Sequence, residues 1–214
     1  MADFADRRHR MVICQIAARG IRDPAVIEAM RDVPRERFVS EELAEFAYED
    51  SPLPIEDEQT ISQPYIVAAM IEAAGIGAHD RVLEVGAGSG YAAGVMGRIA
   101  ARVFAIERHA RLGRLAEARM RDLGYDNVAI RIGDGTRGWP EKAPFDAILV
   151  AAGGPRVPEP LKQQLGISGR LVIPVGEPGN QRLTRMTRTE GGRFETDDLG
   201  AVAFVPLIGA EGWR

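Results

Sequence analysis

Residues 82–90 constrain the possible fold of this chain more than any other stretch. They read Val-Leu-Glu-Val-Gly-Ala-Gly-Ser-Gly, an apolar run that ends in glycines at alternate positions, Gly86, Gly88 and Gly90. A helical pattern follows over residues 91–99, so the whole predicts a strand, a tight turn and a helix, the first unit of a doubly wound α/β fold. Glycine permits positive φ and lets a flat ligand approach the main chain. Three glycines in five residues therefore favour a nucleoside-binding loop over a turn that binds nothing.

The spacing of these glycines indicates which nucleoside is bound. A dinucleotide fingerprint reads G-x-G-x-x-G, whereas here the third glycine comes one residue early and Tyr91 stands where the fingerprint has Gly or Ala. Glu84 also precedes the first glycine by two residues. The resulting E-x-G-x-G-x-G pattern resembles the first motif of Rossmann-like methyltransferases that use S-adenosylmethionine (AdoMet). An NAD-linked oxidoreductase is the alternative that this spacing disfavours.

Strand and helix patterns alternate from residue 81 onward, which predicts a parallel sheet covered by helices on both faces. The expected strands are residues 81–85, 103–106, 128–132, 145–150, 170–175, 182–187 and 199–205, and the expected helices are residues 91–100, 110–123 and 158–165. We expect one methyltransferase domain over residues 1–214, in which residues 1–78 form a helical cover and substrate loop and residues 79–214 form the Rossmann-like AdoMet-binding core.

The N-terminal third has helical patterns and no obvious strand. The expected helices are residues 4–18, 25–30 and 41–48, and Asp23 and Pro24 suit the N-cap and first position of the second. Residues 51–63 form an irregular stretch with prolines and three acids, a reasonable lid. Pro64 then begins another helix, with Ser62 or Gln63 as its cap.

Acids at the ends of two further strands are candidates for binding the rest of the nucleoside. Glu107 ends the strand after the glycine loop, about 20 residues downstream, where an acid usually reaches ribose hydroxyls. Asp134 and Gly135 follow the next strand, and the Asp134 carboxylate is placed to accept from an adenine amino group. Parallel strands bring these groups to one edge of the sheet. The predicted cofactor-binding residues are Glu84, Gly86, Gly88, Gly90, Glu107, Asp134 and Gly135.

The composition is that of an ordinary globular protein and excludes several classes of function. The net charge of −4 gives no global footprint for nucleic acid, and no run is long and apolar enough for a membrane helix. The single cysteine, Cys14, excludes an internal disulfide and fits a reducing, cytoplasmic compartment. Three scattered histidines argue against a zinc site. The sequence leaves the oligomeric state open.

Residues 59–65, Gln-Thr-Ile-Ser-Gln-Pro-Tyr, closely resemble the signature of protein-L-isoaspartate (D-aspartate) O-methyltransferases. Further matching stretches follow in order over nearly the whole chain. They are residues 33–39, 53–55, 133–135 with Trp139, 143–148, 169–176 and 204–207. The resemblance implies an enzyme that transfers the methyl group of AdoMet to isoaspartyl residues of damaged proteins, which initiates repair through a succinimide.

The resemblance also implies that Ser62 is catalytic, because its hydroxyl positions the isoaspartyl carboxylate beside the sulfonium methyl group. Thr60 and Tyr65 would complete the substrate-binding pocket. A carboxylate with a pKa near ~4 is already ionised at pH 7, so the reaction needs no general base. It needs proximity, alignment and exclusion of water. A cap for the helix at Pro64 is the structural alternative for Ser62.

Two stretches depart from the family pattern near the expected substrate pocket. Glu56, Asp57 and Glu58 stand where the family usually has glycine-rich residues, and acids there would repel an anionic substrate. Gly153 and Gly154 stand where the family often has Ala-Ala-Pro. These departures motivate the alternative of a carboxyl methyltransferase dedicated to an Asp of one biosynthetic peptide.

Overall fold

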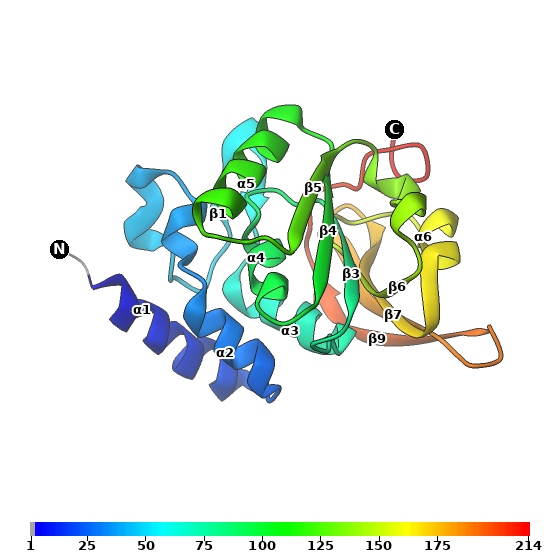
Figure 1. Ribbon diagram of the computed structural model, residues 1–214, viewed down its shortest axis with the longest axis horizontal. Coiled ribbons are helices and arrows are strands. Elements are labelled where there is room, and N and C mark those ends of the chain that lie inside the picture. Colours follow the sequence, from blue (N-terminus) through cyan, green and yellow to red (C-terminus); the bar gives the residue numbers. More distant parts are fainter. Residues whose placement is uncertain (1–2) are drawn as a thin grey trace.

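The computed structural model describes residues 3–214, which form a seven-stranded sheet with helices on both faces (Figure 1). The strand order is β5-β4-β3-β6-β7-β8-β9. The strands are β3 (Arg81–Val85), β4 (Arg102–Glu107), β5 (Val128–Ile132), β6 (Phe145–Val150), β7 (Leu165–Glu177), β8 (Asn180–Arg188) and β9 (Phe194–Val202). The order reverses between β3 and β6, and all pairs from β5 to β7 are parallel. Open sheets of this kind bind ligands at the carboxyl ends of the strands beside that reversal.

The strands bury both faces, with successive residues facing opposite sides. Val82 packs into a core that it shares with α3 (Pro64–Ala74) and α4 (Tyr91–Gly97). Leu83 packs into a second core, which includes Leu161 of α6 (Glu159–Gln164). Figure 1 shows α1 to α5 on one side of the sheet and α6 on the other. The helices are α1 (Phe4–Met11), α2 (Pro24–Asp32), α3 (Pro64–Ala74), α4 (Tyr91–Gly97), α5 (Ala110–Asp122) and α6 (Glu159–Gln164). None of the helices within residues 3–214 is both long and apolar enough to span a bilayer.

The N-terminal helices follow the predicted signals closely. The helix that begins with α1 continues as a π-helical turn (Val12–Ile16) and a 3₁₀ turn (Ala17–Arg19), then ends at Gly20 with φ of 104°. The Asp23 carboxylate accepts from the Ala25 N–H at 2.8 Å and caps α2, which begins at Pro24. The cover shares a core with the sheet, since the rings of Phe38 and Tyr91 meet edge to face with centroids 5.5 Å apart.

Two short strands lie in the stretch that the sequence predicts to be irregular. Residues 51–63 contain a small antiparallel pair, β1 (Leu53–Pro54) and β2 (Thr60–Ile61), which flank a 3₁₀ turn (Glu56–Glu58). Strands of two residues carry no alternating pattern, so the sequence gives no sign of them. The pairing places residues 59–62 at the mouth of the cavity described below.

The sheet is also less parallel than the sequence predicts. β8 and β9 run antiparallel to their neighbours, and β9 begins at Phe194 rather than near residue 199. The missed part of β9 is largely exposed, and its acids pair across the strands, Asp197 with Arg185 and Asp198 with Arg182. An exposed, charged edge strand lacks the apolar alternation by which a strand is recognised.

Candidate active site

The glycine loop follows β3 at the carboxyl edge of the sheet, and its three glycines have positive φ, 88° at Gly86, 53° at Gly88 and 90° at Gly90. Gly86 and Gly88 line a cavity at this edge of the sheet. Gly90 has a different role, because a Cβ there would lie 3.2 Å from Ala116 Cβ and 3.3 Å from Met120 Cε of α5. The third glycine therefore lets α4 begin close against α5, while the first two leave the cavity wall open.

The cavity is enclosed by segments from three parts of the chain. Its floor is the glycine loop with Glu84 and Glu107, one wall is residues 59–62, and another is residues 205–208. Gly135 contributes from the loop after β5. A concave site with mixed apolar and polar walls, at the carboxyl ends of the strands, suits a nucleoside ligand.

Glu107 is buried at the end of β4 and organises the glycine loop. One carboxylate oxygen accepts from the Gly88 N–H at 2.8 Å, and the other accepts from the His109 N–H at 2.9 Å. Each carboxylate oxygen has a second acceptor site. Glu107 can therefore hold the loop and still accept from the two hydroxyls of a ribose, as the sequence predicts.

Glu84 is the most unusual group of the cavity floor. It is 2% exposed, and its Oε2 has no hydrogen-bond partner within residues 3–214. Burial raises the pKa of Glu84 well above its ordinary value, and the negative charge of Glu107 raises it further. A bound ligand with a positive charge would offset both effects. The two acids thus fit a cationic nucleoside such as AdoMet, which carries a sulfonium and an ammonium group.

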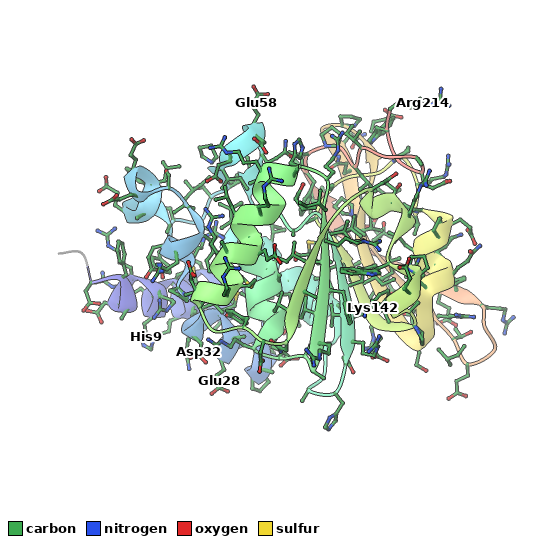
Figure 2. The ribbon with its side chains drawn as sticks, turned by 45° about the horizontal axis from the view of Figure 1, so that its top comes forward. His9, Glu28, Asp32, Glu58, Lys142 and Arg214 are labelled. Carbon is green, nitrogen blue, oxygen red and sulfur yellow. The ribbon has the colours of Figure 1, made fainter. Side chains whose placement is uncertain are left out.

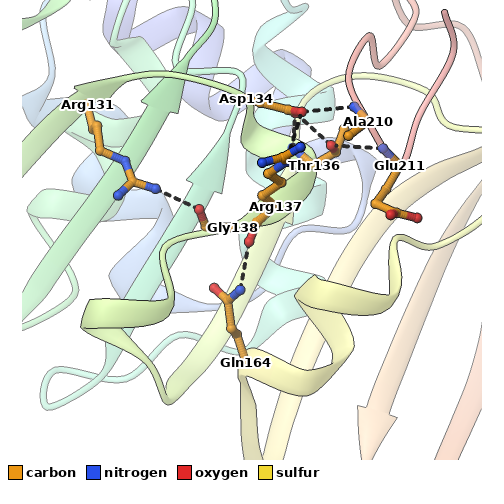
Figure 3. A network of polar contacts seen from close by, with 8 residues as sticks. All are labelled: Arg131, Asp134, Thr136, Arg137, Gly138, Gln164, Ala210 and Glu211. Carbon is orange, nitrogen blue, oxygen red and sulfur yellow. Dashed lines mark hydrogen bonds and ion pairs between the residues drawn. The ribbon is translucent and has the colours of Figure 1, made fainter.

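Asp134 follows β5 at the strand tip, as predicted, and the next residue, Gly135, lines the cavity. Figure 3 shows the Asp134 carboxylate in a polar network with Thr136, Arg137 and Ala210. Oδ1 accepts from the Thr136 N–H at 2.9 Å and the Thr136 hydroxyl at 2.6 Å, while Oδ2 accepts from the Ala210 N–H at 2.8 Å. Burial opposes its ionisation, but these hydrogen bonds and the nearby Arg137 outweigh burial and lower the pKa of Asp134. Asp134 thus ties the C-terminal loop to the Gly135 turn, and its contact with adenine stays a prediction.

A second cavity meets the first at Ser62. Both are lined by Thr60, Ser62, Ala151 and Val205. The Ser62 hydroxyl makes no hydrogen bond to any of residues 3–214, and the N-cap position of α3 is Gln63, without a side-chain cap bond. The capping alternative for Ser62 is therefore not realised. Its hydroxyl remains free at the junction of the two cavities.

Tyr65, predicted beside Ser62, lies outside both cavities. The Arg19 guanidinium stacks 3.5 Å from the centre of its ring. Tyr65 is the second residue of α3, so its side chain follows the helix surface toward the N-terminal cover instead of the strand edge.

The acids of residues 56–58 bind α5 or face solvent. Glu56 pairs with Arg119 at 3.5 Å, and Asp57 lies 3.8 Å from Arg111. Figure 2 shows the Glu58 side chain pointing away from the molecule. These contacts hold the β1–β2 turn over the glycine loop. Ile55 lies so close to Gly88 that a Cβ added at Gly88 would be 3.6 Å from the Ile55 Cδ1 atom. The acids serve a covering segment and do not form the cavity walls.

The second departure from the family pattern is also packed away from the cavities. Ala151 and Ala152 line the cavity wall, whereas Gly153 and Gly154 are buried against Gln181 and Leu207. The two departures therefore give no support to an altered substrate.

Sequence reasoning missed several residues of the site. Residues 205–208 form a wall of the first cavity, and His109 lines it beside Glu107. The Phe-Val-Pro-Leu run at residues 204–207 is the signal that could have identified this wall, because it matches the family without an obvious structural role. No cluster of metal-ligating side chains occurs in the part of the chain from residue 3 to residue 214.

Comparison with known proteins gives the same result as the geometry. The sequence profile of the protein-L-isoaspartate (D-aspartate) O-methyltransferase family matches residues 7–212. The chain belongs to this family. A protein-L-isoaspartate O-methyltransferase of Methylorubrum extorquens (strain PA1) is 62% identical, with 96% of this chain and 90% of that protein aligned. One from Rhodopseudomonas palustris (strain HaA2) is 58% identical, with 98% of this chain and 86% of that protein aligned.

Solved structures of the family have the same fold. One protein-L-isoaspartate O-methyltransferase superposes with a TM-score of 0.88 at 29% identity, covering 96% of this chain and 67% of that one. A Plasmodium falciparum homologue, in complex with S-adenosyl-L-homocysteine, gives 0.81 at 28% identity, covering 94% of this chain and 98% of that one. The predictions of family, Rossmann-like fold, methyltransferase activity and AdoMet as cofactor are confirmed.

Proposed function

We propose that this chain methylates the free carboxylate of L-isoaspartyl and D-aspartyl residues in damaged proteins, the first step of repair through a succinimide, at the junction of its two cavities. The observation that carries this proposal is that Thr60 and Ser62 line both cavities. AdoMet occupies the first cavity, and the isoaspartyl peptide enters through the second. A group bound in one cavity can then meet a group bound in the other only beside Ser62.

Cofactor binding rests on the residues of the cavity floor. Gly86 and Gly88 expose the backbone to the nucleoside, Glu107 accepts from the ribose hydroxyls, and Gly135 borders the base. Gly90 contributes by seating α4 against α5. When bound, AdoMet supplies an electrophilic methyl group on a positively charged sulfur, and that positive charge would favour the ionised form of the buried Glu84.

Ser62 carries the substrate side of the mechanism. Its free hydroxyl donates to one oxygen of the isoaspartyl carboxylate and leaves the other oxygen aimed at the first cavity. Thr60 provides a second hydroxyl on the same wall. The carboxylate attacks as the anion, so no residue has to remove a proton. Orientation and exclusion of water provide the rate enhancement, which the covering turn at residues 56–58 supports.

The proposal also includes the partners, the compartment and the domain organisation that the sequence predicts. The substrates are proteins or peptides, and the net charge of −4 argues against nucleic acid as a partner. The single cysteine suits the cytoplasm. Residues 1–78 and 79–214 work as one domain, since the first part supplies Ser62 and the second supplies the cofactor loop.

Transfer of labelled methyl from AdoMet to a peptide tests the function directly. An isoaspartyl peptide is expected to be methylated, whereas the matched peptide with an ordinary aspartyl linkage is not. Equal transfer to both peptides would overturn the proposal. Competition by a cell extract, with aged and fresh protein compared, distinguishes a general repair enzyme from one dedicated to a single peptide.

Replacing Glu84 with glutamine is expected to stabilise the ligand-free protein while weakening AdoMet binding. An unfolded glutamate ionises near its ordinary pKa of 4.5, whereas the raised pKa in the folded state favours the protonated form of Glu84. Stability is therefore complete below that ordinary pKa and falls as the pH rises through it toward the raised value. Near pH 7, E84Q removes this loss, and each kcal/mol recovered raises Tm by about 2–4 °C. AdoMet affinity should fall about tenfold.

Melting curves at two pH values and a binding titration measure this effect. The Tm difference between E84Q and the unmodified protein should disappear near pH 4, where both side chains are neutral. If E84Q had a lower Tm than the unmodified protein near pH 7, the pKa of Glu84 would not be raised in the folded state.

A further inference from the structure

Gln181, near the start of β8, is a buried polar residue that the mechanism above does not use. It is 1% exposed, and its side-chain amide is bonded at both ends to the backbone of Phe204. Its Oε1 accepts from the Phe204 N–H at 2.7 Å, and its Nε2 donates to the Phe204 carbonyl at 3.2 Å. A single side chain thus satisfies both polar backbone groups of one residue.

The position of Gln181 explains why these bonds matter. β9 pairs with β8 only as far as Val202, which lies opposite Gln181. Beyond Val202 the chain no longer pairs with β8. At Phe204 the Gln181 side-chain amide makes the two backbone hydrogen bonds that a neighbouring strand would otherwise make. Phe204, with Ala203 and Val205, lines the second cavity together with Thr60 and Ser62. The Gln181 amide therefore fixes a part of the wall of the cavity that also contains the Ser62 hydroxyl.

Gly153 provides the space that Gln181 needs. A Cβ at Gly153 would lie 2.1 Å from Gln181 Nε2, far inside van der Waals contact. The Gly153 N–H donates to the Val205 carbonyl at 2.8 Å, and the Gly153 carbonyl accepts from the Leu207 N–H at 2.8 Å. Gly153 and Gln181 thus both bond to the backbone of residues 204–207. Residue 153 is glycine because a Cβ there would collide with the Gln181 amide.

We propose that Gln181, seated on Gly153, is a positioning residue that sets the peptide-binding wall at residues 203–205 relative to Ser62. The proposal rests on the proposed function, because it assigns the second cavity to the isoaspartyl peptide. Gln181 acts through the backbone of Phe204 and touches neither the substrate nor AdoMet. Losing it should therefore change peptide binding more than cofactor binding or turnover.

Steady-state kinetics of Gln181→Met tests this inference. Methionine keeps the side-chain length and removes both hydrogen bonds, so KM for an isoaspartyl peptide should rise about tenfold, the effect of losing one or two net hydrogen bonds. The kcat value and the AdoMet Kd should stay within about twofold. The control is Arg182→Met on the same strand, where an exposed pair with Asp198 is lost and KM for the peptide should not change.

A double-mutant cycle with Gly153→Ala gives a second test. The alanine Cβ should displace the Gln181 amide, and KM for the peptide should rise, whereas Gly191→Ala in the β8–β9 turn should have no effect. In the Gln181→Ala background the space is vacant, so Gly153→Ala should add little. Hydrogen exchange at the Phe204 amide should be faster in Gln181→Met, while Tm measurements confirm that each variant is folded.

The outcomes distinguish this inference from the proposed function. If the unmodified protein does not methylate the isoaspartyl peptide, the proposed function fails and the inference fails with it. If it does, the inference alone fails when Gln181→Met leaves KM unchanged or raises the AdoMet Kd equally. If Gln181→Met does not fold, slow exchange of the Phe204 amide in the unmodified protein supports the inference, and rapid exchange overturns it.

Discussion

Replacing Ser62 with alanine is expected to lower kcat for isoaspartyl peptides about 100-fold, the cost of losing alignment or one hydrogen-bond donor at a reacting centre. The AdoMet Kd should stay within about twofold, because the substitution leaves the glycine loop, Glu84 and Glu107 of the cavity floor unchanged. Tm should not change measurably, since the Ser62 hydroxyl bonds to no group within residues 3–214. Methyl-transfer assays, calorimetric titration of AdoMet and thermal melts measure the three quantities.

Two further variants show whether the loss is specific to Ser62. Ser40→Ala removes an exposed hydroxyl that makes no capping bond and should leave kcat unchanged. Thr60→Val removes the neighbouring hydroxyl and should have a smaller effect than S62A. If S62A lowered AdoMet affinity and turnover equally, Ser62 would be a structural residue and the mechanism proposed above would be wrong.

The second large effect is expected for Glu107→Ala, which should weaken AdoMet binding at least about 150-fold. Two contributions add here. The variant loses charge-assisted hydrogen bonds to the ribose, each about 1.5–3 kcal/mol, and it releases the Gly88 and His109 N–H groups that Glu107 now satisfies. Because Glu107 also raises the pKa of Glu84, the variant should lower the pKa of Glu84. Titration with AdoMet measures the first effect.

Glu107→Gln separates the two contributions. Its side-chain carbonyl can still accept from Gly88, so the loop stays organised while the charge is lost, and the affinity should lie between those of E107A and the unmodified protein. Glu117→Ala on the exposed side of α5 is the control for loss of a negative charge and should have no effect. Unchanged AdoMet affinity in E107A would remove Glu107 from the ribose-binding role.

The parts of the site that sequence predicted well are those fixed by local backbone geometry. Glycine tolerates the positive φ found at Gly86 and Gly88, and their position after an apolar strand places them at the sheet edge. Glu107 follows from the same rule, because it ends the adjacent parallel strand. Each of these inferences needs only a residue type and its distance along the chain.

The parts that sequence left open depend on which distant segments meet. The sequence gives no sign that Ala210, far along the chain, donates to the Asp134 carboxylate. Tyr65 is separated from Ser62 by the start of a helix, which turns its ring toward Arg19. From the sequence, the acids at residues 56–58 are expected to repel an anionic substrate. In the structure, two of them pair with arginines of α5.

The sequence by itself determined the nucleotide-binding strand–loop–helix unit, the acids at the carboxyl ends of its strands and, through the motif at residues 59–65, the family. The tertiary structure alone decided that Ser62 lies free at the junction of two cavities and that residues 203–208 line these cavities with it. The reason is physical. Backbone propensities and hydrophobic periodicity act over a few residues, whereas a cavity is formed by side chains that only long-range packing brings together. The glycine loop could be read from its own residues, but the wall held by Gln181 and Gly153 could not.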